Sequence, residues 1–197
     1  MKRKLLPLLL MLATGVASAQ IAPEAAPAAP EVVAAVDFAD TAFVLICSAL
    51  VLLMTPALAF FYGGLSRSKS VLNTMMMSFT AIGVITIVWV VAGYSIAFGD
   101  EPMGAYFGSF QNVMLAGIDK DSTATTFNAA HLIPKYVFVM FQATFAIIAA
   151  ALISGALVDR MKFGAYIVFI ALWSVLVYAP VAHWVWDASG WLFADGA

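Results

Sequence analysis

Charged residues are scarce in this 197-residue chain, and hydrophobic residues are in excess. Only 10% of the residues are charged and 64% are hydrophobic, whereas about a quarter of the residues of an ordinary soluble protein are charged. A soluble globule of this size cannot hide so much apolar surface. The composition therefore excludes an ordinary soluble protein, and no nucleic-acid partner is expected.

Residues that commonly carry catalysis or bind metals are also few. Cys47 is the only cysteine, so no disulfide or cysteine metal cluster can be built from it. The two histidines, His131 and His183, lie far apart in the sequence. No catalytic triad spacing, phosphate-binding loop or zinc pattern is present. We therefore predict that the chain is not an enzyme, and we expect neither a cofactor nor a metal.

Four long uncharged runs account for the apolar excess. Each run reaches the roughly 20 residues that a helix needs to cross about 30 Å of hydrocarbon. The sequence predicts an all-α polytopic membrane protein with four transmembrane helices, surrounded by the lipid bilayer. The predicted spans are Thr41 to Ser66, Ser70 to Gly99, Tyr136 to Val158 and Phe163 to Trp186.

The first residues are typical of a secretory signal peptide. A basic start, Lys2 to Lys4, precedes a short apolar stretch, Leu5 to Ala13, and Ala17 to Ala19 supply a small-residue cleavage pattern. An uncleaved anchor helix is the alternative. We predict three segments: residues 1–19 as the signal peptide, 20–36 as a flexible extracytoplasmic leader, and 37–197 as a membrane domain.

Loop charges give the orientation independently of the signal peptide. Cleavage after Ala19 leaves the mature N-terminus outside the cytoplasm, so the first and third connections are expected to face the cytoplasm. An excess of Lys and Arg in short loops marks the cytoplasmic side, and acids predominate in the opposite connections. Both signals agree. The two connections carry Arg67, Lys69, Arg160 and Lys162 against a single acid, Asp159.

Small residues at regular spacing indicate helix contact faces. Ala146, Ala150 and Ser154 recur every four residues in the third run, and Gly83 and Gly93 lie in the second. Such residues let two helices approach closely inside a membrane. The long segment between these runs, residues 100–135, is expected to form a structured cap on the outer side.

Phenylalanines gather near the outer end of the third run. Phe138, Phe141 and Phe145 follow helical spacing around Gln142. The amide of Gln142 needs a hydrogen bond or water inside a membrane, so this face is expected to point into the bundle or a wet cavity, and a structural hydrogen bond is expected. A phenylalanine stripe also serves ordinary packing, so the stripe alone decides nothing.

Tryptophans gather at the end of the fourth run, where the helix is expected to break at Pro180. Trp184, Trp186 and Trp191 suit an aromatic belt at the lipid headgroups, above all Trp184 and Trp191. Alternatively, Trp186 completes a cage with the phenylalanines, because aromatic faces attract ammonium-type cations. On these residues alone both interpretations stay open.

Four sequence blocks stand out along the chain: FYGGLSRSKSVLNTMMMSF, FQATFA, GALVDRMKFGAY and PVAHWVWDASGWL. Together they resemble the bacterial ammonium transporters of the Amt, methylammonium permease and Rhesus superfamily. The resemblance runs from about Asp40 to the last residue, and Ser70 stands where the family usually has asparagine. It implies a protein of the bacterial inner (plasma) membrane with eleven helices in two inverted repeats, assembled as a homotrimer. Four helices supply most of the first repeat, so we expect a partial transporter that does not transport alone.

The same resemblance implies roles for the aromatic residues. Phe141 and Phe145 match the pore phenylalanines, with Phe145 at the outer gate, and Trp186 matches the tryptophan that binds ammonium beside it. A tryptophan at this place favours the Amt branch over the Rhesus branch. His183 matches the vestibule and not the pair of pore histidines, so a local hydrogen bond is expected of it. Both pore histidines and an acidic residue near the ammonium site fall beyond Ala197.

Physical magnitudes limit what an aromatic cage can do. One contact between a cation and a ring contributes about 0.5–2 kcal/mol, whereas an isolated ion in a dry medium costs tens of kcal/mol. Rings therefore recruit ammonium without carrying it through an apolar pore. It must lose its proton before neutral ammonia crosses, and in the family proton movement accompanies the ammonia.

The predicted function is therefore ammonium transport, with ammonium or methylammonium as the substrate. The resemblance implies a PII-type nitrogen regulator as a partner on the cytoplasmic face. The alternative is an ammonium sensor of the same fold that signals to a partner. A potassium-type channel is disfavoured, because VAGYS at residues 91–95 lacks the carbonyl-lined filter sequence and lies inside a long apolar run.

Overall fold

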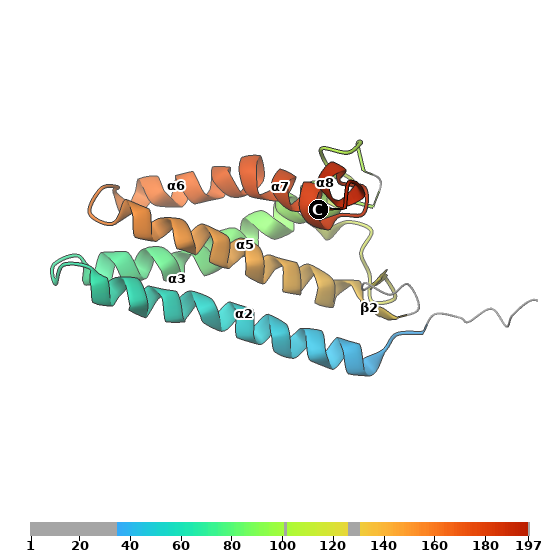
Figure 1. The fold of residues 1–197 in the computed structure, drawn as a ribbon, viewed down its shortest axis with the longest axis horizontal. Coiled ribbons are helices and arrows are strands. Elements are labelled where there is room, and N and C mark those ends of the chain that lie inside the picture. Colours follow the sequence, from blue (N-terminus) through green and yellow to red (C-terminus); the bar gives the residue numbers. More distant parts are fainter. Residues whose placement is uncertain (1–34, 101, 126–130, 197) are drawn as a thin grey trace, which may run out of the picture. The chain divides into compact units, whose positions relative to one another are not determined.

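The computed structural model describes residues 35–100, 102–125 and 131–196, so the predicted signal peptide and most of the predicted leader lie outside the described residues. Four helical segments in this part are long and apolar enough to cross a membrane, which confirms the four predicted spans (Figure 1). Their backbones are helical because a helix satisfies its own polar groups where lipid offers none. The segments cover Phe38–Leu65, Val71–Phe98, Lys135–Leu157 and, with a bend after Trp186, Phe163–Ala194.

The first and third segments are single helices, α2 (Phe38–Leu65) and α5 (Lys135–Leu157). The second and fourth segments each contain a wide π-helical turn. In the second segment, α3 (Val71–Val88) passes through η1 (Trp89–Gly93) into α4 (Tyr94–Phe98). In the fourth, α6 (Phe163–Trp173) passes through η3 (Ser174–Tyr178) into α7 (Ala179–Trp186).

The expected helix break at Pro180 is wrong. Tyr178 and Ala179 keep helical dihedral angles, and Pro180 is the second residue of α7. Proline is tolerated in the first turn of a helical segment, where its missing N–H is not needed. The π-helical turn of η3 shifts the hydrogen-bond register just before this proline, so the chain continues without a break.

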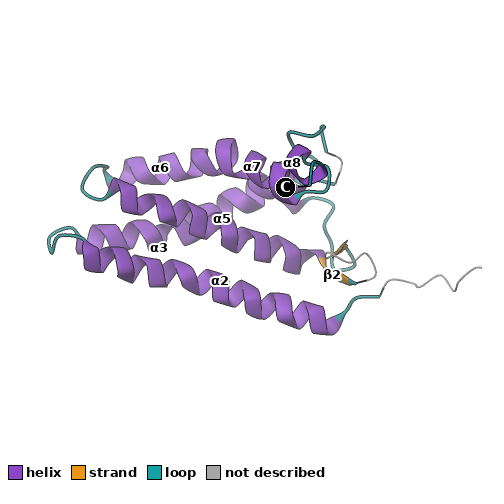
Figure 2. Cartoon of the chain, in the orientation of Figure 1, coloured by secondary structure: helices purple, strands orange, loops and turns teal. Residues whose placement is uncertain are grey.

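Helix packing follows the small residues in the third segment. α2 lies alongside α3 and α5 (Figure 2), these two pack against each other, and α6 packs chiefly against α3. Ala146, Ala150 and Ser154 are fully buried, as predicted. Gly93 is buried against the Trp89 ring of its own helical segment. A Cβ added at Gly83 meets no described atom within 4 Å, so its predicted helix contact is not found among the described residues.

One end of the bundle, which we call the cap end, is covered by the connection between α4 and α5. Its described parts are ordered, as predicted. Asn112 holds this connection together, because its amide oxygen accepts from the Asp100 backbone (2.9 Å) and its nitrogen donates to the Ala116 carbonyl (3.0 Å). The remaining elements there are the 3-10 turn η2 (Val113–Leu115), the antiparallel pair β1 (Thr123–Thr125) and β2 (Leu132–Pro134), and the short helix α8 (Trp191–Ala194).

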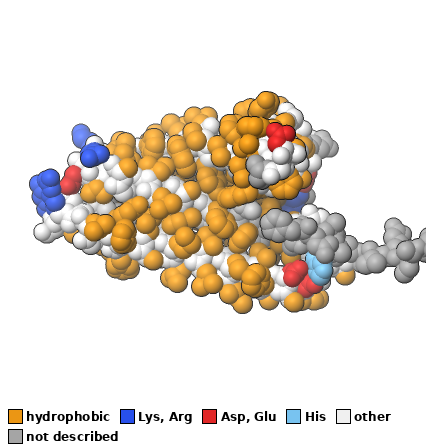
Figure 3. Space-filling view, viewed as in Figure 1, with side chains coloured by type: hydrophobic (Ala, Val, Ile, Leu, Met, Phe, Trp, Pro, Cys, Tyr) orange, Lys and Arg blue, Asp and Glu red, His pale blue; other side chains and the backbone are white. Residues whose placement is uncertain are grey.

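The opposite end, which we call the basic end, carries the two short connections with clustered Lys and Arg (Figure 3). The Ser70 hydroxyl donates to the Asp159 carboxylate, and the Arg67 Nε lies 3.7 Å from the same carboxylate. Ser70 makes no side-chain cap to α3. This serine therefore links the two connections to each other and does not support the start of a helix.

Candidate aromatic site

The structure brings together the three aromatic residues that the sequence singled out. The rings of Phe141 and Phe145, one turn apart on α5, have centroids 5.1 Å apart. The ring of Trp186, the last residue of α7, lies 5.7 Å from the ring of Phe145. Phe145 lies ten residues, about 15 Å, into α5 from the cap end. These three rings, from two separate helices, form what we call the aromatic site.

Both contacts in the aromatic site are edge-to-face. The interplanar angles are 83° for Phe141 with Phe145 and 67° for Phe145 with Trp186. In such a pair the positive edge of one ring meets the negative face of the other. Direct contact at 5.7 Å leaves no room for an ion between Phe145 and Trp186. A cation must therefore lie against a face that is turned away from the partner ring.

The other two residues that the sequence grouped on this face of α5, Phe138 and Gln142, are not part of the aromatic site. Phe138 does not join the aromatic site, because its ring packs on Phe98 of α4 at 5.2 Å and belongs to the core. Gln142 is buried, as expected for a side chain that faces the bundle. The expected hydrogen bond to its side-chain oxygen is not found, since this atom has no partner among the described residues.

Trp184 and Trp191 form a separate pair. Their ring centroids are 6.2 Å apart, and the indole N–H of Trp184 donates to the Tyr106 carbonyl in the cap (2.7 Å). Trp191 is 38% exposed and Trp186 is 45% exposed in this chain. The two tryptophans of the pair thus attach α7 and α8 to the cap, and the belt interpretation for them stays a prediction.

An apolar hollow lies beside the aromatic site. It is an open depression with a volume of about 100 Å³, lined by Tyr178, Val181, Ala182, Val185 and Trp186 on one face of η3 and α7. The atoms exposed in it are apolar. An uncharged molecule is tolerated against such a surface, whereas an ion is not.

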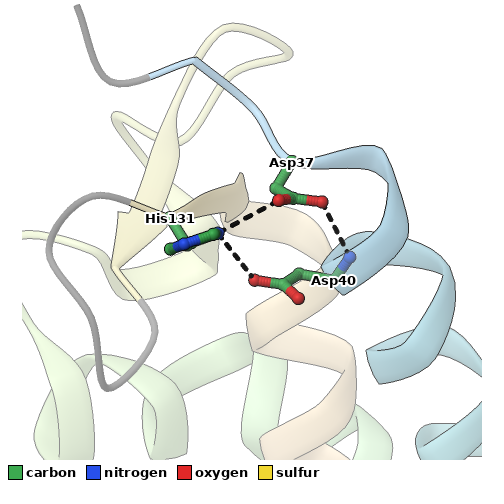
Figure 4. A group of neighbouring side chains, drawn as sticks. All are labelled: Asp37, Asp40 and His131. Carbon is green, nitrogen blue, oxygen red and sulfur yellow. Dashed lines mark hydrogen bonds and ion pairs between the residues drawn. The ribbon is translucent and has the colours of Figure 1, made fainter. Parts of the chain in front are cut away.

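A second cluster at the cap end was missed from the sequence. The His131 Nδ1 lies 3.0 Å from an Asp37 oxygen and 3.4 Å from an Asp40 oxygen (Figure 4). The other Asp37 oxygen accepts from the backbone N–H groups of Ala39 and Asp40, which caps α2. The pKa of Asp37 is lowered, first by the backbone N–H of Asp40 and then by the side chain of His131.

This cluster of Asp37, Asp40 and His131 is the one group among residues 35–100, 102–125 and 131–196 whose donor atoms lie close enough to hold a metal ion. The Nδ1 of His131 already contacts both carboxylates, and the Asp37 carboxylate also caps α2. We interpret the cluster as a clamp that joins the start of α2 to the residue before β2. The sequence separation of 94 residues explains why no spacing pattern revealed it.

The four apolar segments, with charged connections at both ends, define a multi-pass membrane protein. The chain belongs to the ammonium transporter family, because the sequence model of the Ammonium Transporter Family matches residues 42–196. That family is one of membrane transporters.

Curated relatives and solved structures agree with this family. The chain is 51% identical over 165 residues to an ammonium transporter of Aquifex aeolicus (83% of this chain, 37% of the relative). It is 50% identical over 171 residues to an ammonium transporter of Mycobacterium tuberculosis (81% of this chain, 36% of the relative). The crystal structure of Candida albicans Mep2 matches with a TM-score of 0.73 at 32% identity (82% of this chain, 34% of Mep2). The chain thus spans about a third of the length of the relatives it matches.

Proposed function

We propose that the full-length protein that includes this chain transports ammonium, and that the aromatic site recruits the ion. The contact between Phe145 and Trp186 carries the proposal, because it joins α5 to α7 and leaves Trp186 half exposed. Membership of the ammonium transporter family supports it. The proposed role of the chain is binding and passage, not catalysis.

The proposed mechanism follows from the surfaces around the rings. A ring face attracts ammonium by about 0.5–2 kcal/mol, which is enough to hold an ion at a wet surface. The apolar hollow beside Trp186 offers nothing that replaces the hydration of an ion. The proposal therefore requires ammonium to pass its proton to water at the wet surface beside the rings, so that neutral ammonia enters the apolar path and the proton moves separately.

The charges at the two ends support an orientation. We propose that the basic end faces the cytoplasm of a bacterium and that the cap end, with the mature N-terminus, faces outwards. Cleavage of residues 1–19 as a signal peptide belongs to the same proposal. The full-length protein is proposed to be a homotrimer in the inner membrane that meets a PII-type regulator at the basic end.

The replacement of Trp186 by leucine tests the aromatic site. In the full-length protein, Trp186→Leu is expected to raise the half-saturating concentration of radiolabelled methylammonium about two- to thirtyfold, which is 0.5–2 kcal/mol as a ratio. Trp191→Leu is the matched control, because Trp191 pairs with Trp184 and not with Phe145. Uptake is compared at equal amounts of protein in the membrane.

Two results would count against the proposal. If Trp186→Leu and Trp191→Leu have the same half-saturating concentration as the unchanged protein, the rings do not recruit the ion. If the full-length protein binds ammonium but moves no methylammonium, it is a sensor. A solved structure described as "Sensor Amt Protein" matches at 23% identity with a TM-score of 0.68, a likeness that shows the fold alone.

A further inference from the structure

His183 lies three residues before Trp186 on α7 and is fully buried. Its Nδ1 lies 2.9 Å from the Ala97 carbonyl oxygen in α4, and its Nε2 lies 3.3 Å from the Gly104 carbonyl oxygen in the cap. An imidazole nitrogen must carry a hydrogen to bond to a carbonyl oxygen. We assign the donor to Nδ1, which makes the shorter contact. The expected local hydrogen bond of His183 thus reaches 86 residues back along the sequence.

The bond to Ala97 completes the end of α4. This helix ends at Phe98, and Gly99 is extended, so the last carbonyl groups have no partner further along the helix. The Ser95 carbonyl accepts from the Ser109 N–H (3.0 Å) and the Ile96 carbonyl from the Gly108 N–H (2.7 Å). The next carbonyl in this row, that of Ala97, accepts from His183. Two carbonyl groups are thus satisfied by the cap and the third by α7.

The chain after His183 is equally constrained. The Asp187 N–H donates to the His183 carbonyl (3.2 Å), and the Gly190 N–H donates to the Asp187 carbonyl (2.9 Å), which folds the turn back onto the backbone of His183. A Cβ added at Gly190 would lie 2.1 Å from the His183 carbonyl oxygen. Trp186 therefore sits in a short stretch that is held by His183 on one side and by a tight turn on the other.

We propose that His183 is a positioning residue for the aromatic site, because its bond to α4 fixes α7 so that the ring of Trp186 rests on Phe145. The imidazole does not touch the substrate, since its side chain is fully buried. The proposal deepens the proposed function and rests on it. It predicts that loss of the Nδ1 donor misplaces Trp186 while the bundle stays assembled.

Three substitutions of His183 test whether the aromatic site needs an N–H donor at this residue and whether that donor must lie at the place of Nδ1. His183→Leu keeps an apolar side chain and removes the donor. His183→Asn keeps an N–H near the place of Nδ1, whereas His183→Gln places an N–H nearer to Nε2. All three are made in the full-length protein and compared at equal amounts of membrane-inserted protein. Half-saturating concentration and maximal rate of methylammonium uptake are measured separately.

We expect His183→Leu to raise the half-saturating concentration by no more than Trp186→Leu does, with an unchanged maximal rate. His183→Asn is expected to restore most of the loss, and His183→Gln to restore less. The double variant with Trp186→Leu is expected to be no worse than Trp186→Leu alone, because both changes act through one ring. Unchanged uptake in His183→Leu, or losses that multiply in the double variant, would overturn the proposal.

A structural measurement keeps the test independent of substrate binding. The protein is labelled with 5-fluorotryptophan, and the resonance of Trp186 is identified by its loss in Trp186→Phe. His183→Leu is expected to shift or broaden this resonance, and His183→Asn to leave it in place. If Trp186→Leu does not affect uptake, the proposed function fails. The Trp186 resonance in His183→Leu then still shows whether His183 positions the Trp186 ring.

If His183→Leu does not accumulate, the asparagine and glutamine variants decide. A resonance of Trp186 that is native in His183→Asn and shifted in His183→Gln supports the proposal. If the Trp186 resonance has the same position and width in His183→Asn and His183→Gln, the proposal for His183 is overturned.

Discussion

Gly155 provides a sharp test of the packing that holds α5, and with it the aromatic site, in place. A Cβ added at Gly155 would lie 2.5 Å from Cζ of Tyr62 in α2, and 2.8 and 2.9 Å from its two Cε atoms. Non-bonded carbon atoms pack best at about 3.5–4.0 Å. The ring must therefore retreat by about 1 Å in Gly155→Ala if ordinary contacts are to be restored.

The expected cost combines three effects. Overpacking of a close contact costs about 1–3 kcal/mol. Retreat of the ring also weakens the bond from the Tyr62 hydroxyl to the Leu152 carbonyl (3.3 Å), and a typical hydrogen bond contributes about 0.5–1.5 kcal/mol. Alanine gains up to about 1 kcal/mol over glycine from helix propensity. Gly155→Ala is therefore expected to lower the free energy of unfolding by about 1–3 kcal/mol.

The assay is unfolding of the full-length protein from detergent micelles by increasing SDS, followed by circular dichroism. Gly64→Ala is the control, because a Cβ there meets no described atom within 4 Å. This variant is expected to match the unchanged protein or slightly exceed it. Tyr62→Leu combined with Gly155→Ala is expected to recover part of the loss. Equal stability of Gly155→Ala and Gly64→Ala would refute the close approach of α2 and α5.

Two further predictions concern polar groups. Ser78→Ala and Ser154→Ala are each expected to lower the free energy of SDS unfolding by about 0.5–1.5 kcal/mol, because the two buried hydroxyls lie 3.1 Å apart. The double variant should lose less than the sum of the two single losses, and strictly additive losses would contradict the hydrogen bond. The pKa of Asp37 is lowered from 3.8, first by the Asp40 N–H and then by His131. The charged carboxylate therefore stabilises the fold above pH 3.8, and this stabilisation is lost as the pH falls through the lower pKa of the folded protein. Asp37→Asn is expected to reduce the acid-induced loss of stability below about pH 4 in an unfolding series, and an unchanged pH profile would exclude this role.

The spans were predictable from the sequence because lipid leaves the backbone few choices. An uncharged run of sufficient length must become a helix, and the four runs end where Arg67, Asp100, Asp159 and Asp187 supply charges. The buried row of Ala146, Ala150 and Ser154 was predictable for a similar reason. Four-residue spacing places these side chains on one face, and small side chains belong where helices approach closely.

The faces of α4 and α7 were harder to predict. Each follows a π-helical turn, which adds one residue to the helical register. One extra residue rotates the following helix by about 100°, so a regular period from α6 places the side chains of α7 on wrong faces. The sequence grouped Phe138 with Phe141 and Phe145, but Phe138 packs on Phe98 of α4. Only the arrangement of α4 beside α5 separates these phenylalanines.

Interactions between distant segments left no pattern in the sequence. His183 bonds to Ala97, and His131 lies between Asp37 and Asp40, in each case across more than 80 residues. A histidine far in sequence from any cysteine or other histidine matches no metal-binding or catalytic motif. Its role becomes visible only when the carbonyl or carboxylate that it meets is known.

The size of the aromatic site sets a limit on how tightly its rings bind an ion. Phe145 and Trp186 touch edge-to-face, so an ion meets at most one free face of each ring. Two such contacts contribute about 1–4 kcal/mol, while a dissociation constant of 1 mM corresponds to about 4.1 kcal/mol. The rings therefore account for millimolar binding at best. Micromolar binding by the full-length protein would require hydrogen-bond acceptors or a carboxylate beside the rings, and Trp186→Leu would then weaken binding without abolishing it.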